Sequence, residues 1–295
     1  MKVLISDKMD PRCVEILEAN AGITAEVDTG LSPDALQQRI GDYDGLIVRS
    51  STKVTAEVLS AAPKLKVIGR AGTGFDNIDV ETATRCGAIV MNTPGGNSLS
   101  TAEHTFAMVA ALARHIPQAT SSLKNGLWER GKFTGVELSG KSIGIFGLGQ
   151  VGREVARRAG AFGMKVLGRD PYIGEDVAMS CGAQLAAPEE IFAVADFITV
   201  HLHLNDQTHH MISDGEIAQC KDGVYLVNCA RGGLIDEAAL LRGLESGKVA
   251  GAALDVFEEE PPALVDLVVH DRVICTPHLG ASTKEARSNV ALQVA

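Results

Sequence analysis

The sequence Lys141-Ser-Ile-Gly-Ile-Phe-Gly-Leu-Gly-Gln-Val-Gly152 decides the fold expected of this chain. An apolar run ends at Phe146, glycines follow at 147, 149 and 152, a helix-like segment continues to Gly160, and a second apolar run covers Lys165–Arg169. The pattern predicts a strand, a glycine turn, a helix and a second strand. These are the parts of a dinucleotide-binding unit.

A doubly anionic pyrophosphate as the ligand explains why glycine stands at each of these three positions. The N–H groups at a helix N-terminus attract such an anion, and a side chain would hold it away from them. We expect Gly147 to permit the tight turn, Gly149 to let the backbone approach the phosphates, and Gly152 to let the helix pack against the strand.

Asp170 closes the second strand, 23 positions after Gly147. This agrees with the offset of roughly 20 residues expected for a carboxylate that binds the adenosine ribose hydroxyls. Arg169 could instead contact the 2′-phosphate of NADP, but the neighbouring carboxylate would repel that phosphate. The sequence therefore predicts NAD as the cofactor.

Length and composition limit the class of protein. A chain of 295 residues is long for one core, so two domains are expected. The formal net charge of −10 disfavours binding to nucleic acid or an anionic membrane. Apolar runs such as 106–113 are far shorter than the roughly 20 residues of a membrane span. No secretory segment is evident, so we expect a cytoplasmic protein with its six cysteines reduced.

Short strand-like and helix-like segments alternate along most of the chain. Five strands are expected within residues 1–92 and six from Ile143 to Thr276, the first three of these six forming one mononucleotide half. The prediction is an α/β protein with two doubly wound parallel sheets. Residues 115–140, which include Trp128, lack clear periodicity and are expected to form an arm or a subunit contact.

Polar loops follow three strands of the first domain. Arg49–Thr52, Gly69–Gly74 and Asn92–Ser98 each come at or after the carboxyl end of an expected strand. Ligands of open α/β sheets bind outside these ends, and glycine-rich loops expose backbone donors. The loops therefore suit a carboxylate or phosphate, although ordinary polar loops with surface arginines are an alternative.

Arg231, Glu260 and His278 follow the last three expected strands. Interconverting a 2-hydroxy acid and a 2-oxo acid requires a cation for the carboxylate, a proton donor or acceptor, and a hydride carrier. Arginine suits the first role, and histidine, with a pKa of about 6.5, suits the second. A neighbouring glutamate would orient the imidazole. Each residue could instead be an ordinary surface side chain.

The remaining histidines give no comparable pattern. His104 is expected to be a satisfied core residue. The four histidines at 201, 203, 209 and 210 have no acidic or sulfur neighbours at the sequence spacing of metal ligands, so no metal is predicted.

Three segments carry a family resemblance: Asn228-Cys-Ala-Arg-Gly-Gly233, Ala252-Ala-Leu-Asp-Val-Phe-Glu-Glu-Glu-Pro261 and Pro277-His-Leu-Gly-Ala-Ser-Thr283. They resemble the signature segments of the NAD-dependent D-2-hydroxyacid dehydrogenases. Val48–Val54, Gly69–Asn77, Asn92–Pro94 and Gly96–Ser98 resemble the branch that acts on a small phosphorylated hydroxy acid.

The resemblance implies a flavodoxin-like substrate domain, residues 1–97 and 279–295, and a Rossmann NAD-binding domain, residues 98–278. It implies that Arg231 binds substrate, Glu260 orients His278, and His278 is the acid and base. The implied cofactor-binding residues are Thr73, Gly147, Gly149, Gln150, Val151, Gly152, Asp170, Cys229, Ala230, Arg231, Asp255, His278, Gly280 and Ala281. The implied substrate-binding residues are Arg49, Arg70, Gly72, Asn97, Arg130, Arg231 and His278, with Arg130 reaching a partner subunit in a homodimer or larger homo-oligomer.

The chain departs from the family pattern at two positions. His203 stands where the family usually has proline, and Gly95 replaces a polar residue. No room is expected for the family's C-terminal regulatory domains. Alternative functions are the reduction of glyoxylate or oxidation of glycerate, and an NAD-sensing corepressor that retains a similar Arg, Glu and His set.

Overall fold

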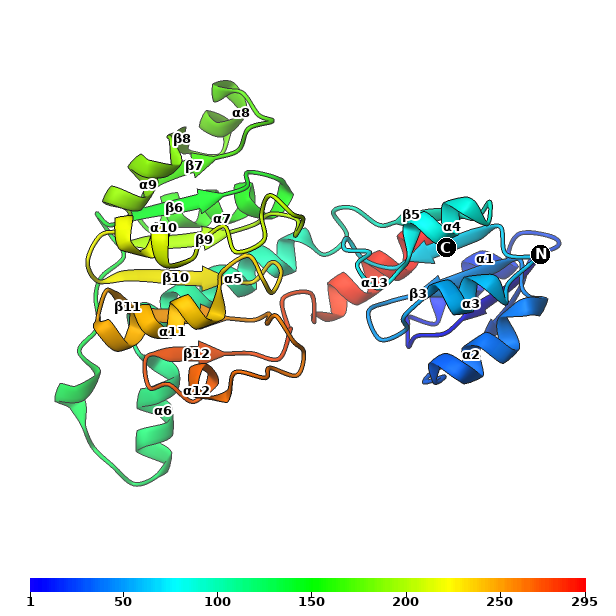
Figure 1. Cartoon of the computed structure of the whole chain (residues 1–295), viewed down its shortest axis with the longest axis horizontal. Coiled ribbons are helices and arrows are strands. Elements are labelled where there is room, and N and C mark those ends of the chain that lie inside the picture. The colour runs from blue at the N-terminus through cyan, green and yellow to red at the C-terminus, as the bar shows by residue number, and fades with distance from the viewer. The chain divides into compact units, whose positions relative to one another are not determined.

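The computed structural model describes residues 1–295 and divides into two compact units. Unit 1 comprises Met1–Ser98 and Ala281–Ala295, and unit 2 comprises Leu99–Gly280. Both units consist of a parallel sheet with helices (Figure 1). The predicted α/β class with two doubly wound sheets is confirmed.

Unit 1 contains a five-stranded parallel sheet in the order β2-β1-β3-β4-β5. Its core contains fully buried Leu4, Leu46 and Ile68 from three neighbouring strands. The strands are β1 (Lys2–Ile5), β2 (Thr24–Val27), β3 (Gly45–Val48), β4 (Val67–Arg70) and β5 (Ile89–Asn92); the connecting helices are α1 (Arg12–Glu18), α2 (Pro33–Arg39), the 3-10 turn η1 (Ile40–Asp42), α3 (Ala56–Ser60) and α4 (Val80–Arg85).

Two local features of unit 1 are the start of α2 and the end of β4. Ser32 caps α2, because its Oγ accepts a hydrogen bond from Ala35 N at 3.2 Å and Pro33 occupies the first helical position. The fourth strand, β4, extends into the segment Gly69–Gly74, which was expected to form a loop. It continues through Gly69 and Arg70, which pair with Met91 and Asn92 of β5.

The last helix, α13 (Lys284–Val294), returns to unit 1 and packs against α1. Ala291 is fully buried in a cluster with Val3 and Ile5 of β1. At Gly69 a Cβ would lie 2.6 Å from the Val294 side chain, so glycine is required for this close approach. Unit 1 is therefore built from two separate stretches of the chain.

Unit 2 contains a seven-stranded parallel sheet in the order β12-β11-β10-β9-β6-β7-β8. Its strands are β6 (Ser142–Phe146), β7 (Lys165–Arg169), β8 (Ala183–Leu185), β9 (Phe197–Val200), β10 (Val224–Asn228), β11 (Val249–Leu254) and β12 (Val273–Cys275). The prediction of six strands missed β8, a three-residue edge strand. Consequently β8, and not β9, is the third strand of the first mononucleotide half.

Helices cover both faces of this sheet. Successive strand residues point to opposite faces, so Val227 joins one core cluster while Leu226 joins the other. The first cluster includes residues of α5 (Ser98–Ala113), α7 (Gln150–Ala161) and α8 (Glu175–Ser180); the second includes residues of α9 (Pro188–Val194), α10 (Asp214–Gln219), α11 (Glu237–Ser246) and α12 (Val265–Val268).

The segment expected to be an irregular arm contains a helix, α6 (Ile116–Lys124), followed by the 3-10 turn η2 (Arg130–Phe133). None of the α6 residues is buried. The helix projects away from the sheet of unit 2 in Figure 1. Because no face of α6 is packed into the core, the sequence lacks the apolar stripe that would have predicted a core-facing helix.

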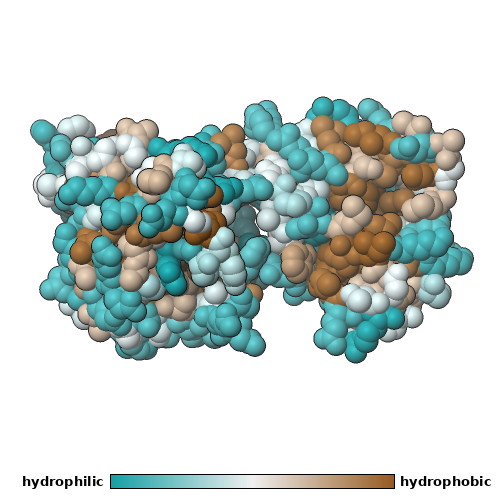
Figure 2. All heavy atoms as spheres, turned by 90° about the horizontal axis from the view of Figure 1, so that it is seen from above, coloured by the Kyte–Doolittle hydropathy of each residue, from teal (hydrophilic) through white to brown (hydrophobic).

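Apolar side chains are unevenly spread over the surface. Figure 2 shows a brown, apolar area on one face of unit 1. Exposed large apolar side chains of unit 1 include Ile89 and Met91 on the edge strand β5. All helices are too short, or too polar, to span a bilayer.

Candidate active site

The glycine turn between β6 and α7 has the geometry that a pyrophosphate requires. Gly147 has a φ of 92°, and a Cβ there would lie 2.4 Å from the His201 carbonyl oxygen. At Gly152 a Cβ would lie 1.9 Å from the Gly147 carbonyl oxygen, so α7 can begin against the turn only with glycine there. Gly149, in contrast, has no protein atom within 4 Å of a would-be Cβ. This space adjoins the N-terminus of α7, where helical N–H groups favour an anion.

Asp170 lies beside the turn. Its Oδ2 accepts a hydrogen bond from Leu148 N at 2.9 Å, and its Oδ1 accepts one from Tyr172 N at 2.9 Å. An ionised carboxylate has about four lone-pair sites, so each oxygen can accept a further bond. The two ribose hydroxyls of an adenosine are donors of the required kind, and the residues of this turn therefore fit a dinucleotide.

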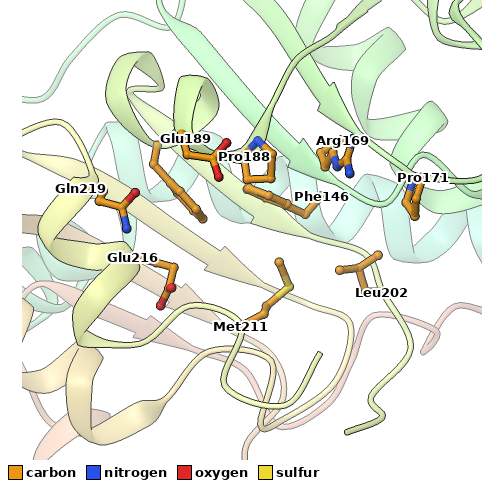
Figure 3. Close-up of a pocket in the computed structure, with 10 residues that line it drawn as sticks. Phe146, Arg169, Pro171, Pro188, Glu189, Leu202, Met211, Glu216 and Gln219 are labelled. Atoms are coloured by element: carbon orange, nitrogen blue, oxygen red, sulfur yellow. The ribbon is translucent and has the colours of Figure 1, made fainter. Parts of the chain in front are cut away.

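A cavity of about 330 Å³ lies next to the end of β7. Figure 3 shows its side chains, with Leu202 and Met211 below Phe146 in this view. The lining is largely apolar but includes the carboxylates of Glu189 and Glu216. Sequence reasoning missed this cavity because its residues come from several separate segments: Phe146, Arg169, Pro171, Pro188, Glu189, Phe192, Leu202, Met211, Glu216 and Gln219.

His201 follows β9 and lies against the glycine turn. Its backbone N–H donates to the Phe146 carbonyl oxygen at 2.7 Å, and its Nε2 lies 3.2 Å from Thr199 Oγ1. Burial lowers the pKa of His201 to about 4. The imidazole is therefore neutral at physiological pH, and it supports the turn without adding positive charge.

The three predicted catalytic residues follow three neighbouring strands. Strands β10, β11 and β12 are adjacent and parallel, and Leu254 pairs with both Asn228 and Cys275 at their carboxyl ends. Arg231, Glu260 and His278 come three, six and three residues after those ends. The topology thus brings residues distant in sequence to one edge of one sheet.

His278 and Glu260 are in direct contact. His278 Nδ1 lies 2.8 Å from Glu260 Oε2, a separation that sequence spacing could not establish. Both side chains remain accessible, with 49% and 42% of their surfaces exposed. His278 has a φ of 53°, a left-handed conformation that is uncommon for residues other than glycine. This backbone conformation is consistent with a functional constraint on the direction of the imidazole.

Asp255, directly after β11, holds the turn that carries His278. Its side chain is almost wholly buried. Its Oδ1 accepts from Leu279 N at 2.7 Å and from Thr276 Oγ1 at 2.5 Å, and its Oδ2 accepts from Gly280 N at 2.8 Å. His104 Nε2 lies 3.2 Å from the same carboxylate, so this histidine has polar partners in unit 2.

The ionisation of Asp255 follows from these contacts. Burial alone would raise the pKa of this carboxyl, but the hydrogen bonds from His104, Thr276 and the two backbone N–H groups outweigh it and lower the pKa below its usual value. Asp255 is therefore a buried anion in a fixed position. The predicted role of Asp255 in cofactor binding stays a prediction.

The loop after β10 is also held by internal hydrogen bonds. Asn228 Nδ2 donates to the Arg231 carbonyl oxygen at 2.7 Å, and Asn228 Oδ1 accepts from Ala230 N at 3.0 Å. A Cβ at Gly232 would lie 1.8 Å from the Phe257 carbonyl oxygen, so this loop and the one carrying Glu260 are in close contact. Burial raises the pKa of the Cys229 thiol to about 12, so the thiol stays protonated at physiological pH.

The predicted anion-binding loops follow the adjacent strands β3, β4 and β5 of unit 1. Arg49 N donates to Asp7 Oδ2 at 2.5 Å, and burial lowers the pKa of the Arg49 guanidinium, aided by the charge of Arg287. The Arg70 guanidinium lies over Gly72, where a Cβ would collide with it.

The third loop is fixed to the second. Thr73 Oγ1 donates to Asn97 Oδ1 at 2.6 Å, and Asn92 Nδ2 donates to the Thr73 carbonyl oxygen at 2.7 Å. Gly95 has a φ of 90°, which explains why glycine stands there.

The predicted site residues are thus divided between the units. Unit 1 contains Arg49, Arg70, Gly72, Thr73, Asn97 and Ala281. Unit 2 contains the glycine turn, Asp170, the loop after β10, Asp255, Glu260, His278 and Gly280, and also Arg130 on η2.

Comparisons with known proteins show the family and the fold of the chain. Residues 106–280 match the model of the NAD-binding domain of the D-isomer specific 2-hydroxyacid dehydrogenases. The chain is 57% identical over 294 residues to D-3-phosphoglycerate dehydrogenase of Homo sapiens, and 50% identical over 300 residues to that of Bacillus subtilis. These alignments cover 100% and 99% of the chain but only 55% of each relative, so the chain spans about half the length of these relatives.

Solved structures are similar to the chain over almost its whole length. A glyoxylate reductase from Paecilomyes thermophila has a TM-score of 0.89 at 33% identity, covering 99% of this chain and 92% of that one. D-lactate dehydrogenase from Aquifex aeolicus, complexed with NAD and lactic acid, has a TM-score of 0.87 at 30% identity, with the same coverage.

Replacing Gly149 by alanine tests the phosphate-binding turn. Because no protein atom lies within 4 Å of the added Cβ, the free energy of unfolding should change little, whereas the methyl group should obstruct the pyrophosphate. We expect the affinity for NAD to fall more than about tenfold, since hydrogen bonds to a charged group contribute about 1.5–3 kcal/mol each. The matched control is Gly160→Ala on α7, which has equal space around it and should bind NAD normally. Unchanged NAD affinity in the Gly149 variant would contradict the assignment.

The lowered pKa of His201 predicts a loss of stability in weak acid. The unfolded chain takes up a proton near pH 6.5 and the folded chain only near pH 4, so the unfolded state binds more protons between these values. Stability attributable to the neutral imidazole is present above pH 6.5 and decreases as the pH falls to 4. Between pH 7 and pH 5 the loss should be on the order of 2 kcal/mol. Denaturant unfolding of the original protein and of His201→Gln at both pH values measures it, and equal pH dependence in the two would disprove it.

Proposed function

The chain belongs to the D-isomer specific 2-hydroxyacid dehydrogenase family, and we propose that it transfers a hydride from C2 of 3-phospho-D-glycerate to NAD, giving 3-phosphohydroxypyruvate, the first step of serine biosynthesis. The observation that carries this proposal is the contact of His278 with Glu260, 2.8 Å apart, at the strand ends of the sheet that also holds the glycine turn. The identity of 57% to a D-3-phosphoglycerate dehydrogenase over the whole chain supports the choice of substrate.

In the proposed reaction His278 Nε2 accepts the hydroxyl proton of the substrate, because Nδ1 faces Glu260. Glu260 orients the ring and stabilises the imidazolium that forms. Arg231 binds the substrate carboxylate, for which its planar guanidinium is suited. The nicotinamide of bound NAD supplies the hydride acceptor.

We assign the phosphate of the substrate to the basic and polar residues of unit 1. Arg49, Gly72 and Asn97 belong to loops that follow adjacent parallel strands, and Arg70 ends one of these strands, which supports a common ligand. The chain has a net charge of −10, so an anionic substrate depends on such local positive groups. Arg130 is assigned to the phosphate pocket of a partner subunit.

We also propose that NAD is bound in preference to NADP. Asp170, beside the glycine turn, would accept hydrogen bonds from the ribose hydroxyls, and two further carboxylates, Glu189 and Glu216, line the adjacent cavity. A 2′-phosphate would meet their repulsion, with Arg169 as the one cation among the lining residues.

We further propose that the protein forms a homodimer or larger homo-oligomer through the segment around α6. Four large apolar side chains of this segment are more than half exposed: Ile116, Leu123, Leu127 and Trp128, the last at 77%. Contiguous exposed apolar side chains are typical of protein–protein contacts, and tryptophan is enriched in them.

Comparing phosphorylated and unphosphorylated substrates tests the proposed substrate class. We expect kcat/KM for 3-phospho-D-glycerate to exceed that for D-glycerate by about 100-fold or more, because each hydrogen bond to a charged group contributes about 1.5–3 kcal/mol. NADH absorbance measures both rates, and D-lactate serves as a third substrate. Equal rates with the two glycerates would refute the assignment and favour a broad hydroxyacid dehydrogenase.

Replacing His278 by asparagine tests the proton-transfer role. Asparagine tolerates the left-handed backbone at this position, so the fold should be retained. We expect kcat to fall by about 100- to 10,000-fold, the usual contribution of a general base, with NAD affinity little changed. His115→Asn is the matched control, since His115 has a φ of 52° and lies on the α6 segment. Turnover near that of the control would rule out the role.

A further inference from the structure

His210 lies between two carboxylates that come from distant parts of the sequence. Its Nε2 is 2.9 Å from Glu258 Oε1, and its Nδ1 is 3.8 Å from Asp236 Oδ2. One ligand atom from each of the three residues can be chosen so that all lie within 4.8 Å of one another. All three side chains are partly exposed, at 33%, 17% and 37%, so the cluster is accessible from solvent. The sequence neighbours of His210 had given no sign of these partners.

Local contacts hold His210 and Asp236 in place. His210 N donates to the Gly233 carbonyl oxygen at 2.7 Å, and Ile212 pairs with Ile235 in a parallel bridge. These contacts fix the segment after β9 against the segment before α11. Asp236 caps α11, since its Oδ1 accepts from Ala239 N at 3.0 Å, and its Oδ2 accepts from Ser213 Oγ at 2.8 Å.

Glu258 is held by the first turn of α11. Its backbone N–H donates to Glu237 Oε1 at 2.7 Å, and its own Oε1 accepts from Glu237 N at 3.3 Å. No long loop therefore has to rearrange to bring the three side chains together. Their approach to one another is set by contacts that the fold already makes.

The local charge is strongly negative. Asp236, Glu237, Glu258, Glu259 and Glu260 supply five carboxylates within two short segments. Asp236 and Glu258 each form an ion pair with His210. A small cation would offset the mutual repulsion of these carboxylates.

We propose that His210, Asp236 and Glu258 form a binding site for a divalent transition-metal ion such as Zn²⁺. Imidazole nitrogens and carboxylate oxygens are both Zn²⁺ ligands, with bonds of about 2.0–2.2 Å that place tetrahedral ligand atoms about 3.3 Å apart. The 2.9 Å contact of His210 with Glu258 would have to widen by only a few tenths of an ångström. Imidazole favours such an ion over Ca²⁺ or Mg²⁺, which prefer oxygen ligands.

The site uses different side chains from the proposed hydride-transfer site but shares a loop with it. Glu258 lies two residues before Glu260, and Phe257 N donates to Glu260 Oε1 at 3.4 Å. A bound ion would join the segment after β9, the start of α11 and this loop. It would thereby restrict the loop that carries Glu260.

Titration of the purified chain with ZnCl₂ in competition with a chromophoric chelator tests the proposal. We expect one ion per chain, with affinity at least tenfold lower in His210→Gly and in Glu258→Gln. Glycine suits the backbone at position 210, where φ is 51°, and glutamine can keep the contacts of Glu258 with His210 and Glu237. His203→Asn, on the same loop but outside the cluster, is the matched control and should bind as the original protein does.

Cysteine ligands are distinguished by repeating the titration with CoCl₂, because thiolate coordination gives an intense near-ultraviolet charge-transfer band that nitrogen and oxygen ligands lack. The proposal predicts a Co²⁺ spectrum without this band. Absence of stoichiometric binding, original affinity in either cluster variant, or a thiolate band that persists in His210→Gly would each overturn it. The readout is independent of turnover, so it is separate from the test of the proposed dehydrogenase activity.

Discussion

The proposed active site depends on the hydrogen bonds that the buried Asp255 carboxylate accepts. Asp255 lies directly after β11 and accepts hydrogen bonds from the backbone of Leu279 and Gly280, which follow β12. An anion in the protein interior is costly unless it is hydrogen-bonded, and these donors satisfy that requirement. The same bonds fix the turn that carries His278. The donors that offset the cost of burying the Asp255 carboxylate therefore also set the position of the imidazole.

The parallel sheet supplies the second part of this constraint. Parallel neighbours end at the same edge, so residues after β10, β11 and β12 come together although 47 positions separate Arg231 from His278. The backbone around them is held by internal hydrogen bonds, whereas Glu260 and His278 keep much of their surfaces exposed. A rigid frame with accessible polar groups is the arrangement that catalysis by positioning requires.

Local patterns made the dinucleotide turn predictable. Gly147 and Gly152 are required by close contacts with the segment after β9 and with the turn itself, and Gly149 leaves open space for a ligand, so the three glycines recur at a recognisable spacing. Long apolar runs likewise identified six strands of unit 2. The edge strand β8 was missed because three residues pairing on one side give too short a signal.

Features made from distant segments were not predictable in this way. The contact of His278 with Glu260 was only a hypothesis until the ends of β11 and β12 were placed. The cavity beside β7 and the cluster around His210 combine segments that share no spacing. Sequence patterns thus determined which strands exist, whereas long-range packing determined which side chains meet.

Hydrogen exchange at the amides of Leu279 and Gly280 tests the central claim most directly. If the Asp255 carboxylate holds this turn, both amides should be protected nearly as well as those of β11, although the Leu279 side chain is 41% exposed. Exchange of both amides at the rate of an unstructured loop, with β11 still protected, would contradict the account.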